Sequence, residues 1–181
     1  MTQPIQTRPT IAADILHLIA LDHTASSEAV WQLELRHDAA ELIVAAFREV
    51  RLPRPVSVAF PHNPRALSDE WTKKSMMQTA LAEGIPVGYL CAQERAPASI
   101  AWVTEIVVGA SSRRQGVGSA LLASAQGWAL GRSHRRLILE MQSKNLPMIR
   151  LAQKFGYEFC GYNDHYYLTQ DVTLFFGKML K

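Results

Sequence analysis

The residues with the clearest potential for ligand binding lie in a glycine-bearing loop between a predicted strand and a predicted helix. The β-branched run of Ile106, Val107 and Val108 predicts a buried strand. Residues 113–118 (RRQGVG) then open an apolar-periodic segment that predicts a helix. Backbone N–H groups at a helix start, together with the positive end of the helix dipole, bind anions. The segment therefore predicts a cradle for a phosphate group.

The side chains of this loop favour a pyrophosphate. Arg113 and Arg114 offer charged donors for phosphate oxygens. Gly116 and Gly118 lack Cβ atoms, so that a pyrophosphate can approach the backbone closely. A dinucleotide-binding fingerprint would need a third glycine where Leu121 stands, and the loop does not end in the Gly-Lys-Ser/Thr of a Walker A motif. These two classes of nucleotide site are therefore disfavoured.

The loop resembles the acyl-CoA loop of the GNAT superfamily of N-acetyltransferases. The family pattern is Arg or Gln, two variable residues, Gly, one variable residue, then Gly or Ala. Arg113, Gly116 and Gly118 satisfy it, and the hydrophobic strand precedes them at the usual distance.

More of the chain is similar to this family. Residues 139–142 (LEMQ), Asn145 and the Lys-Phe-Gly-Tyr run ending at Tyr157 look like the second half of a GNAT core. This half is most similar to the branch that acetylates streptothricin-type compounds. The resemblance covers residues 87–180 well, and the first 86 residues only loosely.

The resemblance implies a fold and a cofactor. The fold would be α/β (α+β), with a mixed, mostly antiparallel central sheet flanked by helices and parallel strands splayed at the acyl-CoA site. Acetyl-CoA would serve as co-substrate, with no metal. The residues implied to bind it are Ile106, Val107, Val108, Arg113, Arg114, Gln115, Gly116, Val117, Gly118, Ser119 and Asn145. In such enzymes a backbone N–H of the strand before the loop polarises the thioester carbonyl.

Glu105 is the ionisable residue on the predicted strand and the candidate catalytic base. The family commonly places its glutamate one residue earlier, where this chain has Thr104. Strand alternation then puts Glu105 on the opposite face unless a bulge intervenes. A proton-accepting carboxylate and a salt-bridged, structural one both remain open.

Two further positions matter by comparison with the family. Asn145 matches an asparagine that contacts the cofactor arm, and it equally suits the N-cap of the helix predicted after it. Seven residues later, where many members carry a tyrosine that protonates the thiolate, this chain has Ala152. Water or another tyrosine would have to take that role, and the candidates are Tyr157, Tyr162, Tyr166 and Tyr167.

Composition bounds the class of protein. With 181 residues, 48% hydrophobic and 19% charged, the chain is expected to form a single globular domain over residues 1–181. The net charge of +3 suits an anionic cofactor and is too small to argue for nucleic acid. No apolar run reaches bilayer length and the start lacks a signal-peptide pattern, which predicts no membrane partner and a cytoplasmic protein. Cys91 and Cys160 are expected to be buried, reduced thiols.

The remaining pattern predicts helices and strands in alternation. Helices are expected at residues 12–21, 27–50 and 146–154, strands at 5–8, 86–93, 100–108, 136–142, 157–167 and 172–179, an extended or looped chain at 51–68, and either type at 71–83.

The sequence thus predicts an acetyl-CoA-dependent N-acetyltransferase acting on a primary amine of a small molecule or peptide. Its acceptor groove would be built from the amino-terminal helices and residues 53–71. Transfer to a protein amino terminus or lysine is one alternative. A catalytically weak acyl-CoA-binding sensor or structural module is another, because of Ala152. Homodimer formation is left open.

Overall fold

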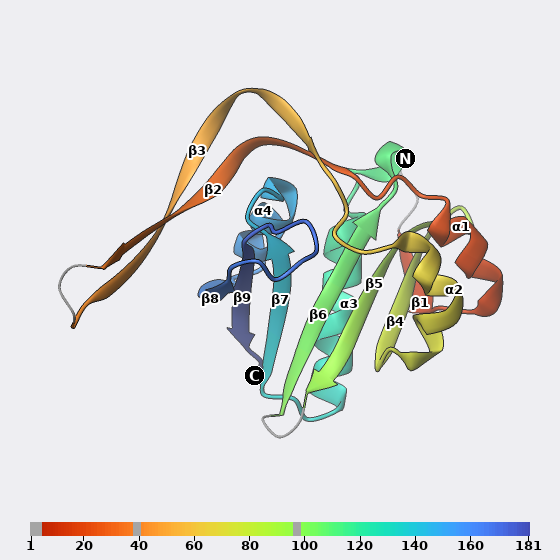
Figure 1. Ribbon diagram of the computed structural model, residues 1–181. Helices are drawn as coiled ribbons and strands as arrows, with labels where there is room; N and C mark the ends of the chain where they lie inside the picture. Colours follow the sequence, from red (N-terminus) through yellow and green to blue (C-terminus); the bar gives the residue numbers. More distant parts are fainter. Residues whose placement is uncertain (1–4, 38–40, 96–98) are drawn as a thin grey trace.

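The computed structural model describes residues 5–37, 41–95 and 99–181, and a seven-stranded sheet runs through its centre (Figure 1). The strands lie in the order β1-β4-β5-β6-β7-β9-β8. Neighbours are antiparallel apart from the parallel pair β6 and β7. The bounds are β1 (Gln6–Pro9), β4 (Met76–Ala82), β5 (Ile85–Arg95), β6 (Ile100–Val108), β7 (Arg136–Gln142), β8 (Glu158–Asn163) and β9 (Thr173–Met179). The predicted mixed, mostly antiparallel sheet is confirmed.

Helices cover both faces of this sheet. The bounds are α1 (Ile15–Ile19), α2 (Leu67–Glu70), α3 (Val117–Gly131) and α4 (Leu146–Lys154), with 3-10 turns η1 (Ala12–Asp14), η2 (Pro64–Ala66), η3 (Trp71–Lys73) and η4 (Ala110–Ser112). Strand side chains alternate between the faces, so that Leu90 lies in the core under α3 and α4 and Tyr89 in the core under α1 and α2. The larger core, beneath α3 and α4, supports the glycine-bearing loop.

A two-stranded arm, β2 (Ala25–His37) paired with β3 (Ile43–Val58), replaces the helix predicted over residues 27–50. That prediction is wrong because residues 31–36 alternate apolar and polar side chains, which is the period of a strand. Leu33 and Phe47 are cross-strand partners on the apolar face of the arm.

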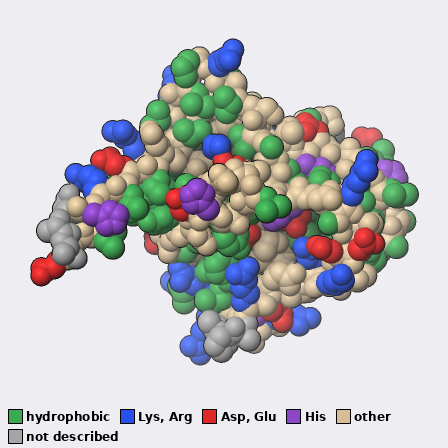
Figure 2. Space-filling view, viewed as in Figure 1, with side chains coloured by type: hydrophobic (Ala, Val, Ile, Leu, Met, Phe, Trp, Pro, Cys, Tyr) green, Lys and Arg blue, Asp and Glu red, His purple; other side chains and the backbone are tan. Residues whose placement is uncertain are grey.

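The arm projects from the body of the molecule (Figure 1). Hydrophobic and charged side chains are interspersed along it in the space-filling view (Figure 2). Towards its end Leu35 and Ile43 are 48% and 69% exposed. Closer to the body, Phe47 packs on Phe159 and Tyr162, with ring centroids 5.3 and 5.2 Å apart. The arm is therefore anchored by aromatic contacts to β8.

The other expected elements mostly agree with the structure. The strands predicted at residues 86–93, 100–108 and 136–142 and the helix at 146–154 are confirmed as β5, β6, β7 and α4. Residues 71–83, where the sequence is compatible with either a helix or a strand, contain η3 and β4. Cys91 is buried as expected, but Cys160 is exposed because β8 is an edge strand of the sheet. Both thiols are free.

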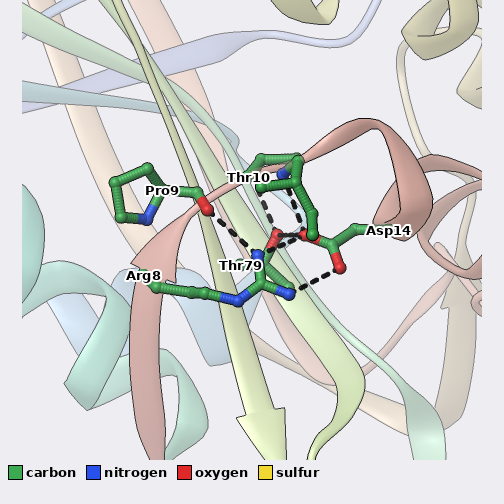
Figure 3. Close-up of polar contacts among 6 residues, drawn as sticks. Arg8, Pro9, Thr10, Asp14 and Thr79 are labelled. Atoms are coloured by element: carbon green, nitrogen blue, oxygen red, sulfur yellow. Dashed lines mark hydrogen bonds and ion pairs between the residues drawn. The ribbon is translucent and has the colours of Figure 1, made fainter.

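A polar cluster joins β1 to β4 beside α1 (Figure 3). The Arg8 guanidinium donates to both carboxylate oxygens of buried Asp14, at 2.7 and 2.8 Å. The Thr79 hydroxyl donates to the same carboxylate at 3.1 Å. Burial opposes the charge of Asp14, yet Arg8 and these hydrogen bonds hold its pKa below the usual value. The cluster thus fixes η1 against β1 and β4.

Candidate functional site

The parallel strands β6 and β7 separate at the end nearest the glycine-bearing loop (Figure 1). Their pairing runs from Ile100↔Arg136 to Val103↔Leu139. The following residues of both strands, 104–108 and 140–142, line a cavity of about 1080 Å³. The splayed parallel pair expected from the sequence is therefore present in the structure.

This first cavity is bounded by most of the residues predicted to bind the cofactor. Its other walls come from the segment leading into β2, from the base of the arm and from α4. The predicted residues that line it are Ile106, Val107, Val108, Arg113, Arg114, Gly116, Val117, Gly118, Ser119 and Asn145. Gln115 points elsewhere, and its side-chain amide donates to the Ser111 carbonyl at 2.9 Å.

The backbone of the loop turns through the left-handed region twice. Gly116, the N-cap of α3, has φ +88°, a value that side-chain-bearing residues rarely adopt, and Arg114 has φ 63°. A Cβ on Gly118 would lie 3.3 Å from Leu151 of α4. The loop therefore needs Gly116 for its conformation and Gly118 for its packing on α4. Its N–H groups stand at the start of a 15-residue helix.

Arg113 ties this loop to its surroundings. Its Nε donates to the Val108 carbonyl at 3.0 Å, and its Nη2 donates to the carbonyls of Asp22 and Thr24 at 2.9 and 2.6 Å. A carboxylate oxygen of Asp22 lies 3.6 Å from the same nitrogen. The guanidinium of Arg113 therefore donates its hydrogen bonds to backbone carbonyls of the protein. Its contact with a phosphate stays a prediction. Arg114 is exposed and carries the same charge.

Asn145 is the N-cap of α4, one of the two roles expected of it. Its Oδ1 accepts a hydrogen bond from the Met148 N–H at 3.2 Å, which confirms it as the N-cap of α4. The residue also lines the first cavity. Contact with the cofactor arm remains a prediction at this position.

A second cavity, of about 470 Å³, adjoins the first. Residues common to both linings are Pro61, Thr104, Glu105, Glu140 and Tyr167. The second cavity is otherwise lined by the segment around η2 and α2, by Lys74 and by the turn after β8 that carries Tyr166. The two cavities therefore meet at these shared residues.

Glu105 reaches this junction through a β-bulge. β5 pairs Cys91 with Glu105 and Ala92 with Val103, so that Thr104 is the extra residue of β6. The bulge reverses the alternation, and Glu105 lies in the wall of both cavities.

The buried carboxylate of Glu105 is held by two neighbouring side chains. Lys74 Nζ lies 3.3 Å from Oε1, and the Tyr89 hydroxyl donates to Oε2 at 3.2 Å. Burial, followed by the charge of Glu105, raises the pKa of the Tyr89 hydroxyl. Glu105 is therefore salt-bridged, as in the structural alternative, and it also lines the junction, where its role as a proton acceptor stays a prediction.

Glu140 is a second carboxylate at the junction, and the sequence interpretation did not assign it a role. It is buried on β7, and the Tyr166 hydroxyl donates to its Oε2 at 3.3 Å. Burial raises the pKa of Glu140 to about 7, against the opposing charge of Arg95 at 4.0 Å. A lone carboxylate within the apolar run 137–141 was the available signal in the sequence.

Of the four tyrosines considered as general acids, two line the cavities and two do not. Tyr157 is buried and its hydroxyl accepts from Gln126, and Tyr162 packs on Phe47 of the arm. Tyr166 lines the second cavity, whereas Tyr167 lines both. Burial raises the pKa of the Tyr167 hydroxyl, which therefore keeps its proton at neutral pH.

Ala152 lies in the larger core and is fully buried. Within the described ranges, no cluster of three or more His, Cys, Asp or Glu side chains is arranged to hold a metal ion. None of the helices described is long and apolar enough to cross a bilayer.

Comparison with known proteins identifies a family. The model of the acetyltransferase (GNAT) family matches residues 36–157. A comparison with curated protein sequences returns no match.

Solved structures of similar fold cover nearly the whole chain. Nourseothricin acetyltransferase is 22% identical, with a TM-score of 0.81 over 98% of this chain and 99% of that one. A Bacillus anthracis protein assigned as a streptothricin acetyltransferase, solved with acetyl coenzyme A, is 18% identical, with a TM-score of 0.74 over 97% and 99%. Ribosomal-protein-alanine N-acetyltransferase from Brucella melitensis is 21% identical, with a TM-score of 0.64 over 97% and 99%. At these identities the likeness establishes the fold, and it agrees with the streptothricin-type resemblance seen in the sequence.

Proposed function

The chain belongs to the GNAT family of acetyltransferases, and from that premise we propose that it moves an acetyl group from acetyl-CoA to a primary amine of a small molecule or peptide. The observation that carries this proposal is the junction of the two cavities, where two carboxylates and Tyr167 meet. The first cavity extends from the junction to the start of α3, where backbone N–H groups can bind an anion. The second cavity extends from the junction to the other side and is lined by acidic side chains.

The residues of the first cavity suit acetyl-CoA. The N–H groups at the start of α3 and the charge of Arg114 would hold the pyrophosphate. The free edge of β6 at Ile106, Val107 and Val108 offers backbone groups to the pantetheine arm and to the thioester carbonyl. When bound, acetyl-CoA supplies the activated acyl group.

The second cavity suits a cationic acceptor. Glu70, Glu105 and Glu140 line it, against one lysine, Lys74. An amine bound there must lose a proton before it attacks, and Glu140 is the group suited to take it. Its pKa of about 7 makes it a proton acceptor at physiological pH, and its ion pair with Arg95, at 4.0 Å, is longer than that of Glu105 with Lys74, at 3.3 Å. Glu105, paired with Lys74, holds the shape and charge of the pocket.

Tyr167 is the candidate donor of a proton to the departing thiolate. It lies at the junction and keeps its hydroxyl proton at neutral pH. Tyr167 would thus take the role of the tyrosine that many family members carry at the position of Ala152.

Two alternatives remain from the sequence. Transfer to a protein amino terminus or lysine would use the same machinery with a larger acceptor. A weakly catalytic acyl-CoA-binding module would bind without turnover. The cytoplasmic location and the homodimer stay predictions.

A screen of amines tests the proposal. Purified protein is incubated with acetyl-CoA and a panel of mono- and diamines, amino acids and short peptides, and thiol release is followed. Titration calorimetry measures acetyl-CoA affinity independently. We expect binding and amine-dependent thiol release, with cationic small amines preferred. Binding without release for any amine would favour the binding module, and no binding would overturn the proposal.

A further inference from the structure

Lys74 places a primary amine of the chain itself in the acceptor cavity. Its side chain is 14% exposed, and it lines the second cavity together with Glu105 and Glu140. Its Nζ lies 3.3 Å from Glu105 Oε1 and 3.9 Å from Glu70 Oε2. The ammonium therefore occupies the kind of position that an acceptor ammonium would take.

We propose that Lys74 is a self-acetylation site of this protein, modified from bound acetyl-CoA when no external acceptor fills the second cavity. The inference rests on the proposed function, because it needs acetyl-CoA in the first cavity. What it adds is an acceptor within the chain and a way in which the enzyme limits its own activity.

The chemistry balances with groups already at the junction. The Lys74 ammonium gives one proton to the Glu105 carboxylate, which is within ion-pair distance. The neutral amine attacks the thioester carbonyl, a C–N bond forms and the C–S bond breaks. The second amine proton ends on the departing thiolate, which gives the free thiol. No oxidant or further reactant is required.

The ion pair explains why an external amine would normally react first. Burial lowers the pKa of Lys74, but the charge of Glu105, its hydrogen bond with Lys74 and the charge of Glu70 contribute together to outweigh burial, so that the pKa is raised and the amine is held protonated. Self-acetylation is therefore slow, because a protonated amine is a poor nucleophile. What favours it is the proximity of the Lys74 amine to the junction. Acetylation would remove the charge of Lys74, leave Glu105 without its partner and put an acetamide into the acceptor cavity.

Intact-protein and peptide mass spectrometry test this inference. Wild-type protein incubated with acetyl-CoA alone is expected to gain one acetyl group, and peptide mapping is expected to place it on Lys74. The rate constant should not depend on protein concentration, because the reacting groups belong to one molecule. A good amine substrate should slow the reaction by occupying the same cavity.

Matched variants separate this reaction from general lysine chemistry. Lys74→Arg keeps the positive charge and should lower incorporation by about tenfold or more, since the reaction depends on one positioned amine. Lys73→Arg changes the exposed neighbouring lysine and should leave incorporation unchanged. Preincubation with acetyl-CoA should reduce amine turnover of the wild type and not that of Lys74→Arg.

The outcomes distinguish this inference from the proposed function. Normal acetyl-CoA binding and amine turnover, with Lys74 unmodified or with acetyl groups spread over exposed lysines, would overturn the inference alone. Absence of acetyl-CoA binding would overturn both.

Discussion

The Tyr166 hydroxyl donates a hydrogen bond to Glu140 Oε2 over 3.3 Å, from the turn after β8 to the splayed end of β7. This bond favours the charged carboxylate, whereas burial disfavours it, and burial dominates. The result is a carboxyl group that titrates near neutrality at the point where the two cavities meet.

Glu140→Gln should therefore lower the rate of amine acetylation by about a hundredfold, the size of effect expected for a general base. In the wild type the rate should rise with pH through about 7, as Glu140 loses its proton. Tyr166→Phe removes a bond to the charged form, so that this rise should move to higher pH. Rate profiles of the three proteins from pH 5 to 9 check this. A wild-type rise that persists unchanged in Glu140→Gln would assign it to another group.

Glu105→Gln should have a smaller effect on the rate, about tenfold. Its carboxylate is already paired with Lys74, and its loss leaves that ammonium facing the acceptor cavity. We therefore expect most of the loss to appear as a raised KM for cationic amines, with acetyl-CoA affinity intact. Steady-state kinetics beside Glu140→Gln decide between the two carboxylates. A larger fall in kcat for Glu105→Gln would make Glu105 the base.

Gly116→Val should weaken acetyl-CoA binding at least tenfold, which is about 1.4 kcal/mol. A Cβ at this position meets no atom within 4 Å, so the effect arises from the φ of +88° that valine does not adopt. The N–H groups at the start of α3 would then be misdirected. Gly127→Ala, on the same helix and also without a nearby atom, is the control expected to bind normally. Calorimetry that shows equal affinity in a folded Gly116→Val protein would remove the loop assignment.

Tyr167→Phe should slow acetyl transfer by about a hundredfold if its hydroxyl protonates the thiolate. Tyr157→Phe removes a hydroxyl of similar burial that lies outside both cavity linings, and it should leave the rate unchanged. An acetyl thioester whose thiol carries an electron-withdrawing group releases a more stable thiolate, which needs the acid less. With this acyl donor, Tyr167→Phe should regain most of the wild-type rate in single-turnover measurements. Equal rates for the two variants would exclude Tyr167 as the acid.

Local sequence pattern was sufficient to predict the strand, the loop and the helix start that line the first cavity. The strand at 106–108, the loop glycines and the N-cap at Asn145 each follow from a few adjacent residues. The second cavity depends on contacts between distant segments of the chain. Lys74, Glu105 and Glu140 come from three separate parts of the chain, and their meeting is set by strand order and by the bulge at Thr104.

The arm shows a different cause of error. Apolar residues within 27–50 also fall near helical spacing, but the strict alternation at 31–36 and the partner strand decide for a hairpin. Two-stranded pairing is a non-local contact, and the spacing of residues within one strand does not reveal it.

Ala152→Tyr introduces the residue that many family members carry, and its effect follows from the packing of α4. Ala152 is fully buried in the core with Ile149 and Tyr157, so that a phenol ring there must displace packed side chains. We expect a loss of about 1–3 kcal/mol in the free energy of unfolding, measured by denaturant titration. Gln153→Tyr, at the next and exposed position, is the control that should unfold like the wild type. Since the added hydroxyl points into the core and not into the first cavity, thiol release should not increase. Unchanged stability together with faster turnover would show that α4 turns to bring position 152 to the sulfur, and would return the role of acid from Tyr167 to this helix.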